Sequence, residues 1–525
     1  MGRTSPVWVV LPLLAAVGLV AVPVPMAARD AEPLKKQLDD VIDGPDYKHA
    51  SWGVLVVDGK SGETVYARNP DMMLAPASVT KLFTCAAALM ELGPDATFDT
   101  EVYQRGIVLS GTLRGDLILV AGGDVTLGGR TDKTGHLTYK NNDHTYANSG
   151  LSEPELTDTD PLAGLNALAK QVKDAGITRV TGEVLIDDRL FIRAQSTGSG
   201  PEAVTPIMVN DNVVDVIIEP GKNPGDAAKV TTRPETAYFQ VDAVVTTSSA
   251  KNTPNVYLNA TGPTHFSVRG EVPVGKTVVR IAPVNDPAPF VRALFIEALR
   301  RNGVQAAAAI ARSGDAQLPA RAWYPEGIRL ATFTSPPFKE TIKVTLKVSH
   351  NLYASTLPCL IAVHSGSRSA EAGLRQEAKL LQELGVDPQA MSFGGGAGGA
   401  NADMVTPRAV VQLLRGMAKR PEWSAFKDGL PVLGLDGTLA QTVNADSPAR
   451  GKVFAKTGTL ANYDTANDRP FLRSKALAGV MTTKKGSTLY FAMIVNNVTL
   501  PPGGSAATHG KVLGRLCEIL YETGP

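Results

Sequence analysis

Ser78 and Lys81 lie three residues apart at the start of a helix predicted over residues 76–92. Residues i and i+3 share one face of a helix, so the Lys81 amine can reach the Ser78 hydroxyl. A serine hydroxyl needs a neighbouring base to act as a nucleophile, and a lysine with a lowered pKa can be that base. The helix N-terminus also favours negative charge that develops near Ser78. The pair predicts nucleophilic catalysis by Ser78, although Ser-x-x-Lys is also common on ordinary helix surfaces.

Two later motifs give this pair its context: Ser-His-Asn at residues 349–351 and Lys-Thr-Gly-Thr at residues 456–459. Each is weak alone, because Ser-x-Asn often caps a turn and Lys-Thr-Gly often ends a strand. In the order Ser-x-x-Lys, Ser-x-Asn, Lys-Thr-Gly they form the motif set of penicillin-binding proteins and serine β-lactamases. If the run through residue 351 is extended, His350 points away from its neighbours, so we do not interpret it as a triad histidine. The chain also has no Gly-x-Ser-x-Gly elbow to support an α/β-hydrolase.

The elements that must position these motifs follow from hydrophobic periodicity and turn signals. A hairpin is predicted from strands at residues 52–58 and 64–67, and two adjacent strands at residues 477–481 and 488–496. Helices are predicted at residues 32–42, 370–384, 407–419 and 506–522. Together these elements indicate a mixed α/β (α+β) domain.

Between the first and second motifs the predicted secondary structure changes from mixed helix and strand to mainly short strands. Residues 97–330 contain mainly short β-type runs, with helices predicted at residues 163–175 and 290–302. Residues 132–152 are polar and rich in turn formers, so we expect a mobile loop there. A length of 525 residues also favours two or three domains. We therefore predict a catalytic domain made of residues 29–96 and 331–525, divided in sequence by a β-rich insertion at residues 97–330 that forms one or two domains.

The N-terminus predicts export. Arg3 precedes an almost wholly apolar run at residues 7–24, and small residues follow at positions 27 and 28. This is the layout of a secretory signal peptide, so we expect residues 1–28 to be a leader and the protein to be periplasmic or otherwise extracytoplasmic. The apolar run is barely long enough to span a bilayer, and an uncleaved membrane anchor is the alternative.

The amino-acid composition limits the classes of partner and cofactor that the protein is expected to bind. The net charge is +1, from 52 Lys+Arg against 51 Asp+Glu, and nothing indicates a nucleic-acid partner, because such binding needs a basic surplus. The three cysteines lie in apolar runs, where buried small hydrophobes are expected, and at most one pair could form a disulfide. No His/Cys cluster has the spacing of a metal site, and no metal or organic cofactor is implied. The sequence leaves the oligomeric state open.

Within the penicillin-binding group, the chain most resembles the class C low-molecular-weight enzymes, the D-alanyl-D-alanine carboxypeptidase/endopeptidases. The resemblance extends over nearly the whole mature chain and includes a large insertion between the first two motifs. It implies a transpeptidase/β-lactamase-like α/β domain whose insertion forms β-rich domains. The stretches that carry it are Ala-Ser-Val-Thr-Lys-Leu-Phe-Thr at residues 77–84, Gly-Gly-Asp at 122–124, Gly-Glu-Val-Leu-Ile-Asp at 182–187, Asn-Asp-Asn at 210–212, residues 348–354, Asp-Gly-Thr-Leu at 436–439 and residues 455–460.

The mechanism that the resemblance implies is acyl transfer on the D-Ala-D-Ala ends of peptidoglycan stem peptides. Ser78 attacks the carbonyl between the two D-alanines while Lys81 takes its proton. The backbone N–H groups of Ser78 and Thr459 form the oxyanion hole. Ser349 relays the proton to the leaving amine, and water then releases the acyl-enzyme.

The resemblance also implies substrate-binding roles. Asn351 holds the substrate amide, Lys456 supplies positive potential for the substrate carboxylate, and the hydroxyls of Thr457 and Thr459 add hydrogen bonds. Asp187 matches an acidic position that receives the diaminopimelate amine in some members. The ordinary alternative for these residues is a structural role in a cap, a turn or a strand end.

Two stretches depart from the family pattern. The Asp-Gly-Ser-Gly-Leu-Ser-Arg-like segment that usually precedes the late helix is replaced by Gly-Gly-Gly-Ala-Gly-Gly-Ala-Asn at residues 394–401. In the family that segment borders the pocket for the charged side chain of the substrate, so the side-chain preference of this protein is open. An Asn/Asp-rich stretch at residues 461–475 resembles an insertion beside the site, which either tunes access or is a passive loop.

The sequence therefore predicts a serine D,D-carboxypeptidase that binds β-lactams, with D,D-endopeptidase activity as an addition. A β-lactamase shares the nucleophile, but no deacylating glutamate is identifiable and the insertion is foreign to the compact lactamase form. The intact motifs oppose a non-catalytic peptidoglycan-binding protein, and nothing supports a broad esterase. Peripheral association with the membrane or the wall stays open.

Overall fold

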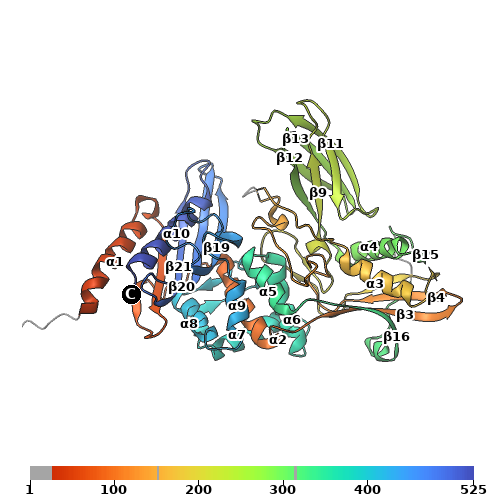
Figure 1. The fold of residues 1–525 in the computed structure, drawn as a ribbon, viewed down its shortest axis with the longest axis horizontal. Coiled ribbons are helices and arrows are strands. Elements are labelled where there is room, and N and C mark those ends of the chain that lie inside the picture. Colours follow the sequence, from red (N-terminus) through yellow and green to blue (C-terminus); the bar gives the residue numbers. More distant parts are fainter. Residues whose placement is uncertain (1–25, 150–152, 312–315) are drawn as a thin grey trace, which may run out of the picture.

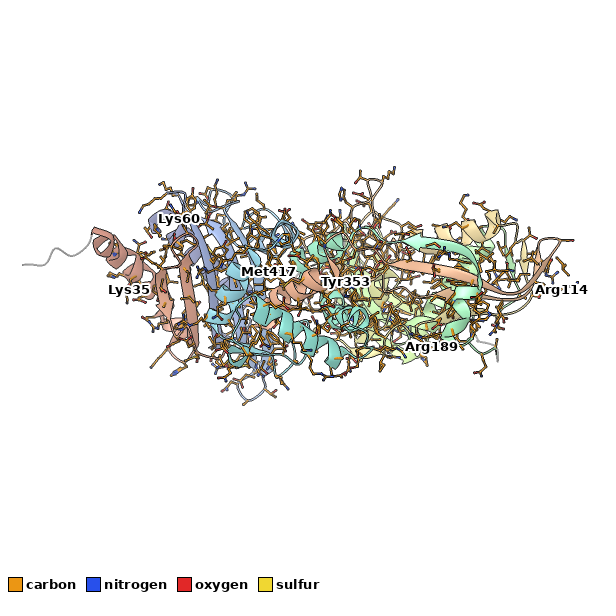
Figure 2. All side chains as sticks on the ribbon, turned by 90° about the horizontal axis from the view of Figure 1, so that it is seen from below. Lys35, Lys60, Arg114, Arg189, Tyr353 and Met417 are labelled. Atoms are coloured by element: carbon orange, nitrogen blue, oxygen red, sulfur yellow. The ribbon has the colours of Figure 1, made fainter. Side chains whose placement is uncertain are left out.

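The computed structural model describes residues 26–149, 153–311 and 316–525. The molecule is elongated, with the N-terminal helix and a large sheet at one end and a helical cluster in the middle (Figure 1). Figure 2 shows Lys35 at one end, Arg114 at the other and Tyr353 between them. The leader expected at residues 1–28 falls mainly on residues 1–25, outside the described residues. In the ranges that are described, every helix is too short or too polar to cross a membrane.

One antiparallel sheet joins the two ends of the chain. Its strands are β1 (Ser51–Asp58), β2 (Thr64–Arg68), β19 (Val453–Asp464), β20 (Arg469–Thr482) and β21 (Thr488–Thr499), in the order β19-β20-β21-β1-β2. The predicted hairpin is β1-β2, and β1 pairs with β21 along its whole length. The inner residues of β1 are all buried, because α1 (Met26–Ile42) and α10 (Ala506–Thr523) cover one face of the sheet and the helical cluster covers the other.

The helical cluster is built around α2 (Thr80–Leu92), whose residues from Thr80 to Leu89 are all buried. A helix that is enclosed on every side needs small or apolar residues all round, and the Leu-Phe-Thr-Cys-Ala-Ala-Ala-Leu run at residues 82–89 supplies them. Helices α5, α6 and α7 contact α2 most closely, and α8 packs on the sheet. The other helices are α5 (Phe338–Lys347), α6 (Asn351–His364), α7 (Ala370–Glu383), α8 (Pro407–Met417) and α9 (Trp423–Gly429).

The chain between α2 and α5 forms the other end of the molecule. A six-stranded sheet has the order β15-β5-β4-β3-β16, with β6 also on β4, and helices α3 (Ala163–Asp174) and α4 (Pro287–Arg301) share its core. Two three-stranded sheets, β10-β9-β14 and β11-β13-β12, pack against each other through a small valine-rich core. The strands are β3 (Asp99–Leu109), β4 (Thr112–Val120), β5 (Arg179–Val180), β6 (Val184–Asp187), β9 (Val213–Glu219), β10 (Lys229–Arg233), β11 (Gln240–Ser248), β12 (Asn255–Gly262), β13 (His265–Pro273), β14 (Val278–Pro283), β15 (Gln305–Ala306) and β16 (Ile328–Thr334), with the two-stranded pairs β7 (Ala194–Gln195)–β8 (Ala203–Val204) and β17 (Met391–Ser392)–β18 (Met404–Val405).

The run before Asn351 is not extended, so the condition under which His350 would point away from its neighbours is not met. Helix α5 ends at Lys347, and Ser349 adopts a left-handed backbone conformation with φ of 62°. Helix α6 begins at Asn351, and His350 is its buried N-cap, whose ring nitrogen accepts a hydrogen bond from the backbone N–H of Tyr353. Both helices are buried against α2, and this packing fixes their helical conformation.

The two other loop-like stretches have different outcomes. Residues 132–149 form an irregular run of turns with one 3₁₀ turn, His144–Tyr146, as expected of a loop. Its inner part is packed, since Asp143, His144 and Thr145 are buried and their polar side chains form ion pairs and hydrogen bonds inside the protein. Residues 150–152 lie outside the described residues. The stretch at residues 461–475 extends β19 and β20 into a long hairpin, paired out to Asp464 and Arg469. All three cysteines are buried and free, as small hydrophobes are expected to be.

Candidate active site

The turn that carries Ser78 is clamped between two glycine-containing segments. Ser78 lies in a single 3₁₀ turn, Ala77–Val79, that leads directly into α2. A Cβ at Gly458 would come within 2.4 Å of the Pro76 carbonyl oxygen, and a Cβ at Gly398 within 2.0 Å of the Ala77 carbonyl oxygen. Only glycine permits backbone approaches this close. Strand β19 and the 394–401 stretch therefore press against the Ser78 turn from two sides.

The Lys81 ammonium lies at the centre of the site. Its Nζ atom is 2.9 Å from Ser78 Oγ, 2.7 Å from Asn351 Oδ1 and 2.6 Å from the Ala397 carbonyl oxygen. Lys81 is fully buried, and among the described residues it has no carboxylate in ion-pair contact. Burial lowers its pKa to about 7, against smaller opposing effects of Cys85 and Asp403. Near neutral pH, a substantial fraction of Lys81 is therefore the free amine, which can accept the Ser78 proton.

Residues 349–351 bring a second hydroxyl and an amide to the same place. Ser349 Oγ accepts a hydrogen bond from Lys456 Nζ at 2.8 Å. Asn351 uses its oxygen for Lys81 and donates from Nδ2 to the carbonyl oxygen and the Oγ of Ser199, at 3.0 and 3.1 Å. Two hydroxyls, those of Ser78 and Ser349, are thus each hydrogen-bonded to a lysine amine, and the Asn351 amide is bonded to Lys81.

The Lys-Thr-Gly-Thr motif lies on β19, the edge strand of the sheet. Lys456 is fully buried, and burial together with the charge of Lys81 lowers its pKa well below the usual lysine range. Thr457 Oγ1 is 2.8 Å from Thr438 Oγ1, and Thr459 Oγ1 accepts a hydrogen bond from Lys475 Nζ at 2.8 Å. The strand therefore presents an amine and two hydroxyls next to the Ser78 turn.

The structure joins most of the predicted site residues by direct contacts. Hydrogen bonds connect Ser78, Lys81 and Asn351, and a separate bond connects Ser349 to Lys456. Thr457 and Thr459 follow Lys456 on the same strand.

Asp187 is not part of this set. Its carboxylate, at the end of β6, receives hydrogen bonds from Arg189 at 2.9 and 2.6 Å and from the Tyr324 hydroxyl at 2.5 Å. Its role in binding a substrate amine stays a prediction, and its carboxylate is already paired.

Sequence reasoning missed several residues that complete the site. The 394–401 stretch contributes the Ala397 carbonyl to Lys81, and Asp403 closes this loop by accepting from the backbone N–H groups of Gly394 and Ala400. Thr197 and Ser199 reach the site from the region between the first two motifs. For the 394–401 stretch, the run of glycines was the one available signal, because glycines permit a close approach of the backbone to its neighbours.

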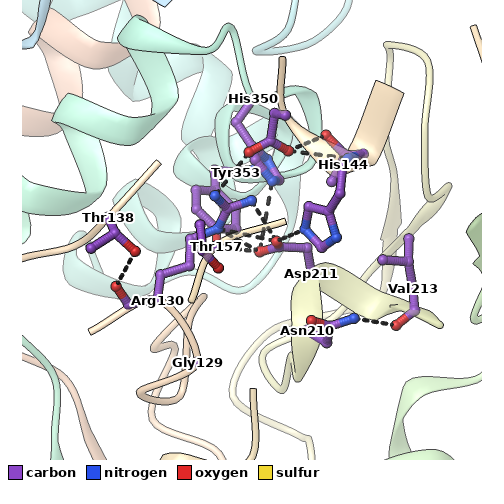
Figure 3. Close-up of polar contacts among 12 residues, drawn as sticks. Gly129, Arg130, Thr138, His144, Thr157, Asn210, Asp211, Val213, His350 and Tyr353 are labelled. Carbon is purple, nitrogen blue, oxygen red and sulfur yellow. Dashed lines mark hydrogen bonds and ion pairs between the residues drawn. The ribbon is translucent and has the colours of Figure 1, made fainter. Parts of the chain in front are cut away.

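A buried ion network lies behind residues 349–351 (Figure 3). Arg130 pairs with Asp143 at 2.8 Å and with Asp211 at 2.6 Å, and His144 bridges Asp211 and Asp215 at 2.6 Å each. Burial alone would lower the pKa of His144, but the charge of Asp215 and the hydrogen bonds to both aspartates raise it to about 10. His144 is therefore a cation at neutral pH, which balances the buried carboxylates.

This network is connected to the start of α6. The Tyr353 hydroxyl donates to Asp211, and the His350 ring stacks on Tyr353 with 3.7 Å between ring centroids. The Tyr146 hydroxyl donates to the Ser349 carbonyl oxygen at 2.5 Å. Residues from far earlier in the chain thus fix the backbone that carries Ser349 and Asn351.

Comparison with known proteins gives a consistent result. The family described as "D-Ala-D-Ala carboxypeptidase 3 (S13) family" matches residues 34–511. A D-alanyl-D-alanine carboxypeptidase from Actinomadura sp. (strain R39) is 28% identical, covering 100% of this chain and 92% of the relative. The crystal structure of penicillin binding protein 4 (dacB) from Haemophilus influenzae has a TM-score of 0.69 at 20% identity, covering 92% of this chain and 99% of that one. Its complex with a β-lactam has a TM-score of 0.67 at 20% identity, covering 93% and 99%. The predicted α/β fold of the transpeptidase/β-lactamase type is confirmed.

Proposed function

The chain belongs to the D-Ala-D-Ala carboxypeptidase 3 (S13) family, as a serine-type enzyme of the class C penicillin-binding proteins, and on that premise we propose that it works through an acyl-enzyme on Ser78. The substrate is the D-alanyl-D-alanine end of peptidoglycan stem peptides. The observation that carries the proposal is the 2.9 Å contact between Ser78 Oγ and the buried Lys81 amine. A hydroxyl that is hydrogen-bonded to an amine of lowered pKa is an activated nucleophile.

In the first step, Ser78 Oγ forms a bond to the carbonyl carbon between the two D-alanines, and its proton passes to Lys81 Nζ. The backbone N–H groups of Ser78 and Thr459 stabilise the resulting oxyanion. The close packing of Gly458 on the Ser78 turn supports this assignment, because it fixes the two segments against each other.

The C–N bond then breaks, and the leaving D-alanine amine must gain a proton. Ser349 relays to this amine the proton that Lys81 took from Ser78, so Lys81 becomes a free amine again, and a hydrogen bond from Lys456 Nζ holds the Ser349 hydroxyl in place. Water then attacks the ester carbonyl while Lys81 takes a proton from it, and Lys81 passes this proton to Ser78 Oγ as the ester C–O bond breaks and the shortened peptide leaves. No metal or organic cofactor takes part in this scheme.

The binding roles follow from the remaining donors. Asn351 Nδ2, now bonded to Ser199, would hold the substrate amide after exchange of that partner. Lys456 and the hydroxyls of Thr457 and Thr459 face the substrate carboxylate, and arrival of that anion would favour the protonated form of Lys456. Asp187 would receive a substrate amine only by exchanging Arg189 for it.

Intact mass spectrometry with penicillin tests this scheme. The purified mature protein is mixed with excess drug and followed over minutes to hours, with Ser78→Ala as the matched control. We expect a one-to-one adduct that persists in the wild type and is missing in Ser78→Ala. An adduct that turns over quickly, with hydrolysed drug accumulating, would instead identify a β-lactamase. A wild type that never forms an adduct would contradict the acyl-enzyme.

D,D-endopeptidase activity uses the same chemistry on a cross-linked peptide, and a purified cross-linked muropeptide dimer tests it. Export of the protein, with residues 1–28 as a cleaved leader, completes the proposal, and the N-terminus of the secreted protein tests it. We assign the catalytic domain to residues 29–96 and 331–525 and the insertion to residues 97–330. Pairing of β1 with β21 supports that division.

A further inference from the structure

Lys475 adds a third lysine to the site. It lies on β20 directly opposite Thr459, its cross-strand partner on β19. Its Nζ atom donates to Thr459 Oγ1 at 2.8 Å, which is the one hydrogen bond its side chain makes to the described residues. Among the described residues no carboxylate pairs with this ammonium, and burial lowers its pKa to about 8.

A partly buried ammonium with two unused donors is costly unless something compensates it. Helix α10 packs closely on this side chain at Gly510, where a Cβ would lie 3.3 Å from Lys475 Cε and 3.5 Å from Nζ. Because its pKa is about 8, most of Lys475 is charged at neutral pH. A smaller fraction of Lys81 and of Lys456 is protonated at this pH, since the pKa of Lys81 is lowered to about 7 and the pKa of Lys456 is lowered well below the usual lysine range.

The bond to Lys475 also orients the Thr459 hydroxyl. Because the Thr459 oxygen accepts from the ammonium, its own proton is free to point towards another acceptor. Thr457 lies two residues earlier on the same face of β19. The Thr457 hydroxyl donates to Thr438 Oγ1 at 2.8 Å, whereas the Thr459 hydroxyl and the Lys475 ammonium offer two neighbouring free donors, which suits a carboxylate.

We propose that Lys475, acting with Thr459, is a specificity residue that binds the free α-carboxylate of the substrate and the corresponding carboxylate of β-lactams. The inference rests on the proposed function, because it assigns Lys475 to the same acylation site. It also gives the stretch at residues 461–475 a role beyond that of an inserted loop, since Lys475 closes that stretch.

The test compares a penicillin that carries a free carboxylate with its methyl ester. For each, the second-order rate constant of acylation is measured for the wild type, Lys475→Met, Lys475→Arg and the exposed control Lys485→Met. We expect the carboxylate-to-ester ratio to fall about 10- to 100-fold in Lys475→Met, the range for loss of a hydrogen bond to a charged group. Lys475→Arg should recover part of the ratio, and Lys485→Met should keep the wild-type ratio.

A Lys475→Met protein with the wild-type ratio would overturn the assignment, as would an equal loss for both ligands. If Lys475→Met does not fold, the same carboxylate-to-ester ratio is measured for Lys475→Gln. The wild type alone is also informative, since a wild type that reacts equally with acid and ester recognises no carboxylate. Failure of the proposed function is separable, because a wild type without a Ser78 acyl-enzyme would react with neither ligand.

Discussion

The pH dependence of acylation tests whether Lys81 is the base. Burial lowers the pKa of Lys81 to about 7, while Cys85 and Asp403 oppose the shift. The base is the neutral amine, so its population increases as the pH rises through that value. For a single group of this pKa, the neutral fraction is about 3% at about pH 5.5 and about 97% at about pH 8.5. The second-order rate constant of acylation should therefore rise roughly 30-fold between these two pH values.

Stopped-flow fluorescence with a labelled penicillin methyl ester measures this profile. The ester is preferable because recognition of a free carboxylate by Lys475, whose pKa is lowered to about 8, would add a falling limb. Lys81→Arg is the matched control, because a guanidinium stays protonated and the rise should vanish with the activity. Thermal unfolding at both ends of the range monitors the fold. A flat or falling profile for the wild-type protein would refute Lys81 as the base.

Three further predictions concern the frame of the site. Tyr353→Phe removes the hydroxyl that donates to Asp211, so the free energy of unfolding in urea should fall by about 1–3 kcal/mol and acylation should slow. Glu377 is buried with its pKa raised to about 8, so it is protonated when folded and ionised when unfolded at intermediate pH. Stability should therefore fall by about 1.4 kcal/mol per pH unit between about pH 4.5 and 8, and Glu377→Gln should remove that slope in urea titrations at several pH values. Gly458→Ala places a Cβ 2.4 Å from the Pro76 carbonyl oxygen, so labelling by fluorescent penicillin should be lost while circular dichroism still reports a folded protein.

The sequence predicted the site because its motifs are local in the chain. The spacing of Ser78 and Lys81 already fixes their contact on one helical turn, and the order of the three motifs predicts that they meet. The resemblance then supplied roles that spacing alone could not give. The helices at residues 370–384, 407–419 and 506–522 and the β1-β2 hairpin were predicted for a similar reason, since each has a clear period or turn signal.

Features that depend on contacts between distant residues could not be predicted. The tight turn at Ser349 arises from the packing of α5 and α6 on α2, which no local pattern records. The ion network needs Arg130, Asp143 and Asp211 to meet across long separations, and a polar, turn-rich stretch is usually a loop. The contact of Lys475 with Thr459 follows from strand register, and a shift of one residue would turn Lys475 to the other face.

The electrostatics of the site suggest how substrate binding and base strength are connected. Lys81 and Lys456 are buried without a carboxylate partner among the described residues, and burial followed by the charge of Lys81 lowers the pKa of Lys456. A substrate carboxylate at Thr459 and Lys475 would bring the missing anion, and it would favour a proton on the lysine nearest to it. If Lys456 takes that proton, its charge makes protonation of Lys81 harder, so Lys81 stays a free amine beside Ser78. A ligand with a free carboxylate would then bind more tightly and also meet a larger fraction of Lys81 as the free amine, whereas an ester would gain neither advantage.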